Sequence, residues 1–229
     1  MEENRIRPPA RLWLALAVFV PVLGICTFLP AGTFAYWQGW VLLAVYLGSS
    51  LAVLWYLLRF NPALMERRMR SGPSAEPEKS QGVAVLVISL GFFALFVVSS
   101  FDFRYHWSAV PPVLVILGDL LVIAGWYVVY RVFRENSFAS SAIGVSGEQR
   151  VIASGPYAVV RHPMYAGAIL WSVGIPLGLG SCAGLAVLVF IIPAFLFRLA
   201  GEERYLSRHL PGYTEYLAQV PWRLVPGVF

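Results

Sequence analysis

The chain alternates long, uninterrupted apolar stretches with short polar connections. Because the hydrocarbon core of a bilayer is about 30 Å thick and a helix rises about 1.5 Å per residue, about 20 apolar residues are enough to cross it. Four stretches approach or exceed that length, namely residues 12–29, 37–58, 83–101 and 110–130, and only the last contains a charged residue, Asp119. Each stretch predicts a transmembrane helix.

A fifth apolar run, residues 163–197, also lacks charged residues but is too long for one helix across the membrane. We predict a tight helical hairpin that turns at residues 178–184. Glycines mark this run, and Gly174, Gly178, Gly180 and Gly184 would let the two helices of the hairpin approach closely. The expected fold is an all-α polytopic membrane protein with about six transmembrane helices, followed by short cytoplasmic C-terminal helices.

Composition and charge support this reading and add an orientation. The 229 residues are 59% hydrophobic and 13% charged, whereas a soluble domain carries about 25% charged residues. Of the 17 Lys and Arg residues, only Arg104 falls outside the N-terminal segment, the 59–82 loop, the 131–162 segment and the tail from residue 198. The positive-inside rule therefore predicts that both termini and both long loops are cytoplasmic, and we expect a prokaryotic plasma membrane. No nucleic-acid partner is expected, since the cations follow the loops.

Candidate chemistry gathers in the last third of the chain. A Gly-Pro-Tyr turn at residues 155–157 precedes His162 and Pro163 at one mouth of the hairpin. Arg198 and Glu202 stand at the other mouth with i, i+4 spacing, so a continuing helix places them on one face. Alone, that pair would fit a surface ion pair and His162 a helix-start residue. Their convergence at both mouths of one hairpin favours a site.

Four strings carry a family resemblance. GPYAVVRHPMYAG (155–167), EERYL (202–206), GYTEY (212–216) and VPWRLVPGVF (220–229) resemble the isoprenylcysteine carboxyl methyltransferase family of integral membrane methyltransferases. The resemblance covers about residues 135–229. It divides the chain into a four-helix transmembrane framework, residues 1–134, and a cofactor region, residues 135–229, with a transmembrane hairpin and an amphipathic C-terminal segment.

The resemblance implies a cytoplasmic pocket for S-adenosyl-L-methionine. The cofactor contacts carried over by position are Arg150, Val151, Ile152, Tyr157, His162, Pro163, Met164, Tyr165 and Glu202. Arg198 receives a catalytic and substrate-binding role. Gln149 stands where eukaryotic members carry a histidine, so it receives none. The ending VPWRLVPGVF is typical of prokaryotic relatives, which leaves the identity of the methyl acceptor open.

The implied reaction is methyl transfer to a lipophilic small molecule or lipidated acceptor that enters from the bilayer. In-line displacement at a sulfonium needs positioning and electrostatic stabilisation rather than a metal or a covalent nucleophile. A carboxylate acceptor is ionised at pH 7, and Arg198 would hold it by forked hydrogen bonds. A thiol or amine acceptor would need a base, for which His162 and Glu203 are the candidates.

Two other functions remain open from the sequence. An NADPH-dependent membrane sterol or enone reductase has a similar C-terminal pattern and would use cations such as Arg150, Arg161, Arg204 and Arg208 for the 2′-phosphate. A transporter or structural protein would instead depend on Asp119, although an interhelical hydrogen bond explains that residue equally well. Three histidines and two cysteines show no metal-ligand spacing, so no metal is expected.

Overall fold

The computed structural model describes residues 10–69, 72, 74, 76, 78–139, 143–145 and 149–229. Within these residues the chain is helical, with no strand, which confirms the predicted fold class. Arg5, Arg7 and Arg70, three of the cations that predicted the orientation, lie outside the described residues, as does part of the 59–82 loop.

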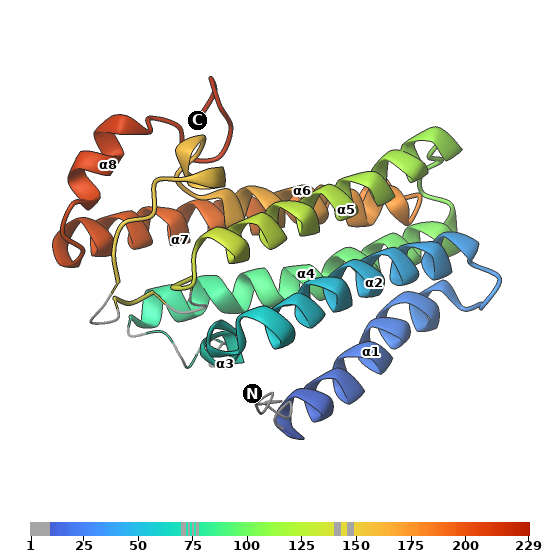
Figure 1. Cartoon of the computed structure of the whole chain (residues 1–229). Coiled ribbons are helices and arrows are strands. Elements are labelled where there is room, and N and C mark those ends of the chain that lie inside the picture. The colour runs from blue at the N-terminus through green and yellow to red at the C-terminus, as the bar shows by residue number, and fades with distance from the viewer. Residues whose placement is uncertain are drawn as a thin grey trace.

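Long helices run back and forth between two ends of the molecule (Figure 1). They are α1 (Ala10–Ala31), α2 (Trp37–Phe60), α4 (Lys79–Tyr105), α5 (Pro112–Glu135), α6 (Pro163–Gly178) and α7 (Leu188–His209). Among the described residues, five helices are long and apolar enough to cross a membrane, and α6 is the long helix that falls short. With 16 residues, α6 is about 24 Å long. The four framework helices contain the predicted ranges almost completely.

The short elements distinguish the two ends of the bundle. The start of α1, α3 (Pro62–Met69), the 3-10 turn η2 (Gly155–Ala158), α8 (Tyr213–Gln219) and the C-terminal segment lie at one end (Figure 1). A second 3-10 turn, η3 (Ala183–Val187), lies at the opposite end, immediately before α7. We call the first the basic end, because the described loops rich in arginine all lie there, whereas Arg104 lies near the opposite end.

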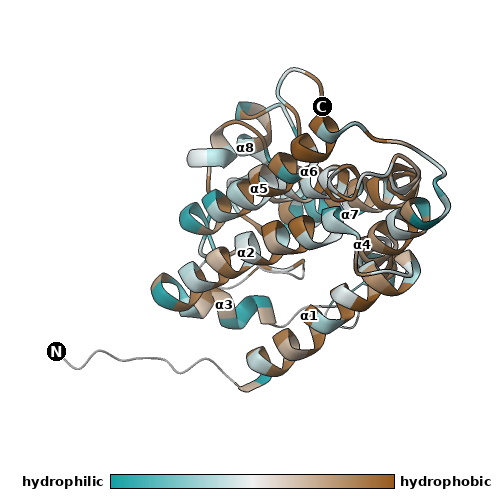
Figure 2. Ribbon diagram, turned by 90° about the vertical axis from the view of Figure 1, so that its right-hand side faces the viewer, coloured by the Kyte–Doolittle hydropathy of each residue, from teal (hydrophilic) through white to brown (hydrophobic). Residues whose placement is uncertain are grey.

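The outer surface of the long helices is apolar. Figure 2 shows hydrophobic residues on the outward faces of the bundle as well as between the helices. Leu14, Ile25 and Leu29 of α1 are exposed, as are Ile116 and Leu120 of α5. Apolar surface on this scale is costly in water and suits contact with lipid. The chain is therefore an integral membrane protein.

Helix α6 packs against α5 through glycines spaced seven residues apart. A Cβ atom on Gly125 of α5 would lie 2.5 Å from the carbonyl oxygen of Gly167 of α6. One on Gly174 would lie 2.6 Å from the carbonyl oxygen of Gly118. Both distances are shorter than any Cβ contact, so glycine is required for the two backbones to touch.

The predicted partner is wrong for two of the hairpin glycines. Gly174 and Gly178 contact α5 and not α7, whereas Gly184 contacts Pro176 of α6, as expected, in addition to Ser99 of α4. The reason is that α5 also offers glycines, which match those of α6, while α7 presents larger side chains such as Ile191 to α4. Because the two helices of the hairpin are held by different neighbours, space remains between them at the basic end.

A buried carboxylate fixes the opposite end. Asp102 of α4 accepts hydrogen bonds from the backbone N–H of Ser108 at 2.7 Å and from its hydroxyl at 2.5 Å. It also accepts one from the Ser181 hydroxyl at 2.5 Å and one from the Ala183 N–H at 3.2 Å. These bonds join the loop after α4 to the turn of the hairpin. Asp119 is buried against Gly178 near this same end, far along α5 from the basic end.

Candidate active site

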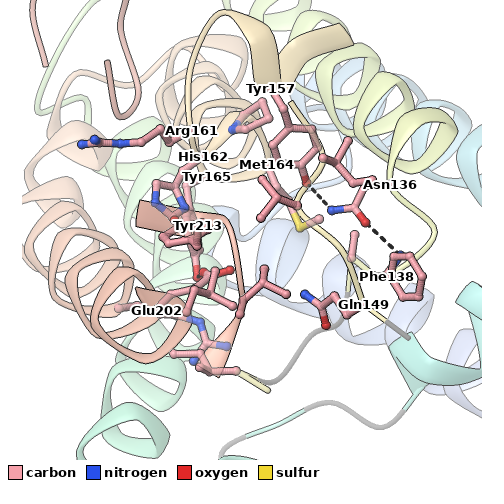
Figure 3. Close-up of a pocket in the computed structure, with 18 of the residues that line it drawn as sticks. Asn136, Phe138, Gln149, Tyr157, Arg161, His162, Met164, Tyr165, Glu202 and Tyr213 are labelled. Atoms are coloured by element: carbon pink, nitrogen blue, oxygen red, sulfur yellow. Dashed lines mark hydrogen bonds between the residues drawn. The ribbon is translucent and has the colours of Figure 1, made fainter. Parts of the chain in front are cut away.

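A cavity of about 310 Å³ opens at the basic end, between α6, α7, α8 and the connector, residues 136–162 (Figure 3). Its volume falls at the lower limit of the range found for small-molecule pockets. All ten residues expected at the site line this cavity, namely Arg150, Val151, Ile152, Tyr157, His162, Pro163, Met164, Tyr165, Arg198 and Glu202. Residues that are up to 52 positions apart in the sequence thus share one wall.

The predicted turn at residues 155–157 is confirmed as the start of η2. Gly155 has a φ of +57°, in the left-handed region that favours glycine. A Cβ atom there would lie 2.9 Å from a carboxylate oxygen of Glu135, the last residue of α5. Glu135 also accepts a hydrogen bond from the hydroxyl of Ser154. The turn is therefore fastened to the end of α5 and directs Tyr157 into the cavity.

Tyr157 is held from both sides. Its hydroxyl oxygen accepts a hydrogen bond from Asn136 Nδ2 at 3.0 Å (Figure 3). Its carbonyl oxygen accepts one from the Tyr216 hydroxyl at 2.8 Å. Asn136 is oriented in turn by the N–H of Phe138, at 2.8 Å. Burial raises the pKa of Tyr157 above its ordinary value, so the phenol stays protonated and keeps its proton available for donation.

Glu203 links three segments behind the cavity wall. Its Oε1 lies 2.9 Å from Arg161 Nε and 3.3 Å from His162 Nε2, and its Oε2 accepts from Arg223 Nε at 3.1 Å. The backbone reinforces the link, since the N–H groups of Arg161 and His162 donate to the carbonyls of Trp222 and Arg223, both at 2.9 Å. Helix α7, the start of α6 and the C-terminal segment are thereby joined. Glu203 therefore has a structural role and does not line the cavity.

Helix α6 begins as the sequence predicts. Pro163 occupies the first turn, where its missing N–H costs nothing, and buried His162 stands at the N-cap position. Tyr165, in the same first turn, donates to Glu202 Oε2 at 2.7 Å. The predicted helical continuation past residue 197 is also confirmed, because Arg198 and Glu202 both lie in α7.

Arg198 is not a surface residue. It is only 6% exposed, and its Nη2 lies 2.7 Å from Oε1 of Glu76, a residue of the 59–82 loop. The interpretation of Arg198 as part of an exposed ion pair is therefore excluded. A buried guanidinium at this position can orient an anionic or polar group inside the cavity.

Several cavity residues were missed by sequence reasoning, and Arg68 of α3 is the most informative. Its Nη1 donates to the carbonyl of Ala139 at 3.1 Å and lies 3.6 Å from Met164 Sδ, and its guanidinium stands 4.7 Å from the centre of the Phe133 ring. Burial lowers the pKa of Arg68 to about 10, so it remains charged at neutral pH. In the sequence this residue served only as a topology signal.

The other missed residues had weaker or different signals. Tyr213 and Tyr216 belong to the GYTEY string, whose tyrosines could have suggested a role, and Asn136 lies at the start of the connector. Gln149, which was left without a role, also lines the cavity.

Four apolar residues of the membrane-spanning helices also line the cavity, and we call the part that they line the apolar limb: Ile88 of α4, Ala168 and Trp171 of α6, and Phe195 of α7. Trp171 lies two helical turns inside the start of α6, so the limb reaches the depth of the membrane-spanning segments. The upper part of the cavity is lined by the polar groups described above. A polar compartment and an apolar limb thus share one cavity.

Comparisons with known proteins agree with this arrangement. A family model described as phospholipid methyltransferase matches residues 113–211, which cover α5 to α7. Protein-S-isoprenylcysteine O-methyltransferase B from Arabidopsis thaliana is 28% identical over 151 residues, 62% of this chain and 72% of the plant protein. Protein-S-isoprenylcysteine O-methyltransferase from Saccharomyces cerevisiae is 28% identical over 121 residues, 51% of each chain.

A further relative carries a different name. The Delta(14)-sterol reductase of Mus musculus is 28% identical over 142 residues, 55% of this chain but only 33% of the mouse protein. The plant and yeast relatives match the chain over comparable or larger shares of their own length, and the family model also names a methyltransferase. The chain is therefore similar to isoprenylcysteine O-methyltransferases and to the phospholipid methyltransferase family model, with the family model matching from α5 to α7.

Proposed function

We propose that the protein transfers the methyl group of S-adenosyl-L-methionine to a lipophilic acceptor that carries a carboxylate, at the cytoplasmic face of the membrane. The observation that carries this proposal is the single cavity in which a polar compartment continues into an apolar limb. A water-soluble cofactor suits the first and an apolar tail suits the second.

The residues of the polar compartment fit the cofactor. Glu202 offers a carboxylate for the amino group, and the rings of Tyr157 and Tyr165 offer π faces for a sulfonium. Arg68 and the first N–H groups of α6 supply positive potential for the carboxylate of the methionine moiety. When bound, the cofactor supplies an electrophilic methyl group. The protein supplies orientation and a site partly shielded from water.

Arg198 holds the acceptor in this proposal. It lies on α7 one turn before Glu202 and one turn after Phe195 of the apolar limb, so it stands between the two compartments. Forked hydrogen bonds from its guanidinium would orient a carboxylate towards the polar compartment, while the tail of the acceptor lies in the limb. Because a carboxylate is already ionised, no general base is required.

Binding measurements test the cofactor assignment. Purified protein in lipid nanodiscs should bind S-adenosyl-L-methionine in a calorimeter, and Glu202→Gln should weaken that binding at least about tenfold. Glu215→Gln, which changes an exposed carboxylate of α8, is the matched control and should bind as wild type does. Incubation with labelled cofactor and a lipid extract should then place the label in an apolar product.

The mouse relative favours one competing function, a reductase that binds NADPH. The structure places Arg150 and Arg161 at the cavity, but Arg204 and Arg208 are exposed on α7 and do not line it. The same calorimetry decides between the two functions. Binding of NADPH without a response to S-adenosyl-L-methionine would refute the methyltransferase proposal.

A further inference from the structure

Arg198, which we assign to binding the acceptor, already forms an ion pair with the carboxylate of Glu76. Glu76 Oε1 lies 2.7 Å from Arg198 Nη2, and Glu76 Oε2 accepts a hydrogen bond from the N–H of Ile143 at 3.2 Å. The side chains of Glu76 and Arg198 are 1% and 7% exposed. A charge of the 59–82 loop is thus buried against Arg198, which lines the cavity, whereas Glu76 itself does not line it.

The ion pair between Glu76 and Arg198 changes the electrostatic environment of an acceptor carboxylate. Two ions that leave water together are tolerated because each neutralises the other, and Glu76 and Arg198 form such a neutral pair. A second carboxylate brought to the same guanidinium would face the charge of Glu76 in a poorly hydrated site, where repulsion is strong. An anionic acceptor must therefore exchange with Glu76 on Arg198 or bind weakly.

We propose that Glu76 is a specificity-determining residue of the acceptor site, because its carboxylate already pairs with one of the two Nη groups of Arg198 that an acceptor carboxylate would use. This inference rests on the acceptor role proposed for Arg198. Exchange of one carboxylate for another gains little by itself, so net binding comes from the tail in the apolar limb. Each methylene that is removed from water strengthens binding about fourfold. Glu76 thereby selects carboxylates with long apolar tails and excludes short, soluble ones.

Isosteric substitution tests the proposal. Glu76→Gln removes the charge and keeps one oxygen, which can accept from either Arg198 or Ile143. The probes are dodecylthioacetate, a thioether carboxylate, and its uncharged amide, with affinities measured in nanodiscs by calorimetry. Glu76→Gln should bind the carboxylate at least about tenfold more tightly than wild type does, with no change for the amide. Glu78→Gln, which alters an exposed carboxylate two residues away, should match wild type.

A double variant identifies where the carboxylate binds. The gain produced by Glu76→Gln should disappear when Arg198→Gln is added. A gain that persists without Arg198, or an unchanged carboxylate affinity in both Glu76→Gln and Glu76→Ala, would overturn the proposal and leave Glu76 as a structural tie. Measuring cofactor binding with the same samples distinguishes failure of the proposed function from failure of the inference about Glu76. If no variant binds S-adenosyl-L-methionine the proposed function fails, whereas normal cofactor binding with unchanged probe affinity defeats only this inference.

Discussion

Gly118 of α5 and Gly174 of α6 touch backbone to backbone, since a Cβ atom on Gly174 would lie 2.6 Å from the Gly118 carbonyl oxygen. The contact leaves no room for a methyl group on either helix. It also sets the position of the start of α6, which carries His162, Pro163 and Tyr165 at the cavity. Together with the Gly125–Gly167 contact nearer the basic end, this packing determines how α6 lies at the site.

Gly118→Ala should destabilise the protein. The added Cβ would lie 2.2 Å from the backbone nitrogen of Gly178, and a backbone cannot yield as a flexible side chain does. We expect a loss of about 2 kcal/mol, seen as a lower melting temperature in detergent. Gly48→Ala on α2 is the matched control, because nothing lies within 4 Å of its Cβ position. Equal melting temperatures for the two variants would contradict the close contact.

Glu203→Gln should loosen the C-terminal segment. The substitution removes the negative charge that pairs with Arg161 and Arg223, and it weakens the contact with His162. We expect about 2 kcal/mol of destabilisation together with weaker cofactor binding, because the start of α6 moves. Arg204→Gln, on the exposed face of the same helix, should change neither quantity. Protease digestion can check the segment directly, and resistance equal to wild type would argue against the link.

The Tyr216 hydroxyl gives a pH-dependent prediction. Burial raises its pKa to about 12, whereas an unfolded tyrosine ionises near pH 10. Below pH 10 both states keep the proton, and the hydrogen bond to Tyr157 contributes its full stability. Between about pH 10 and 12 the unfolded chain loses the proton first, so wild type loses stability that a phenylalanine variant cannot lose.

Tyr216→Phe should therefore be less stable than wild type at pH 8, by about 1 kcal/mol for the lost hydrogen bond. The difference should shrink as the pH rises towards 11. Thermal unfolding across this range measures it. A difference that stays constant with pH would show that the phenol is not buried as described.

Asp102→Ala should destabilise the end of the bundle opposite the cavity. Ser108 and Ser181 would lose their shared acceptor, and buried donors without partners cost about 1 to 3 kcal/mol each. Cofactor affinity of the fraction that remains folded should be unchanged, because the cavity lies at the basic end. Ser89→Ala, at an exposed position of the same helix, should have little effect. A selective loss of cofactor affinity would contradict this separation of the two ends.

Cys182 reports the orientation in the membrane. It is exposed in the turn of the hairpin, at the end opposite the arginine-rich loops, which the positive-inside rule places outside the cytoplasm. A membrane-impermeant maleimide should therefore label it in intact bacterial cells. In a Cys182→Ala background, Arg208→Cys at the basic end should react only after permeabilisation. The reverse pattern would invert the predicted topology.

The sequence was sufficient for what depends on local pattern. Apolar length predicted the framework helices, and the i, i+4 spacing placed Arg198 and Glu202 on one helical face. The sequence could not show that Gly174 contacts Gly118. Glycine spacing indicates that another helix can approach closely, but it does not identify which helix. The contact of Glu76 with Arg198 could not be predicted either, because nothing in the sequence of a polar loop indicates that its carboxylate pairs with a residue 122 positions away.

The shortness of α6 has a physical consequence for the reaction. A bilayer core is about 30 Å thick, and α6 spans about 24 Å of it, with its far end fixed by the Asp102 cluster. The helix that carries one wall of the cavity thus begins about 6 Å below the level at which a full-length span would emerge. The floor of the cavity is recessed into the bilayer. In the proposed methyl transfer, donor and acceptor would therefore meet below the membrane surface, and the acceptor need not be lifted out of the membrane.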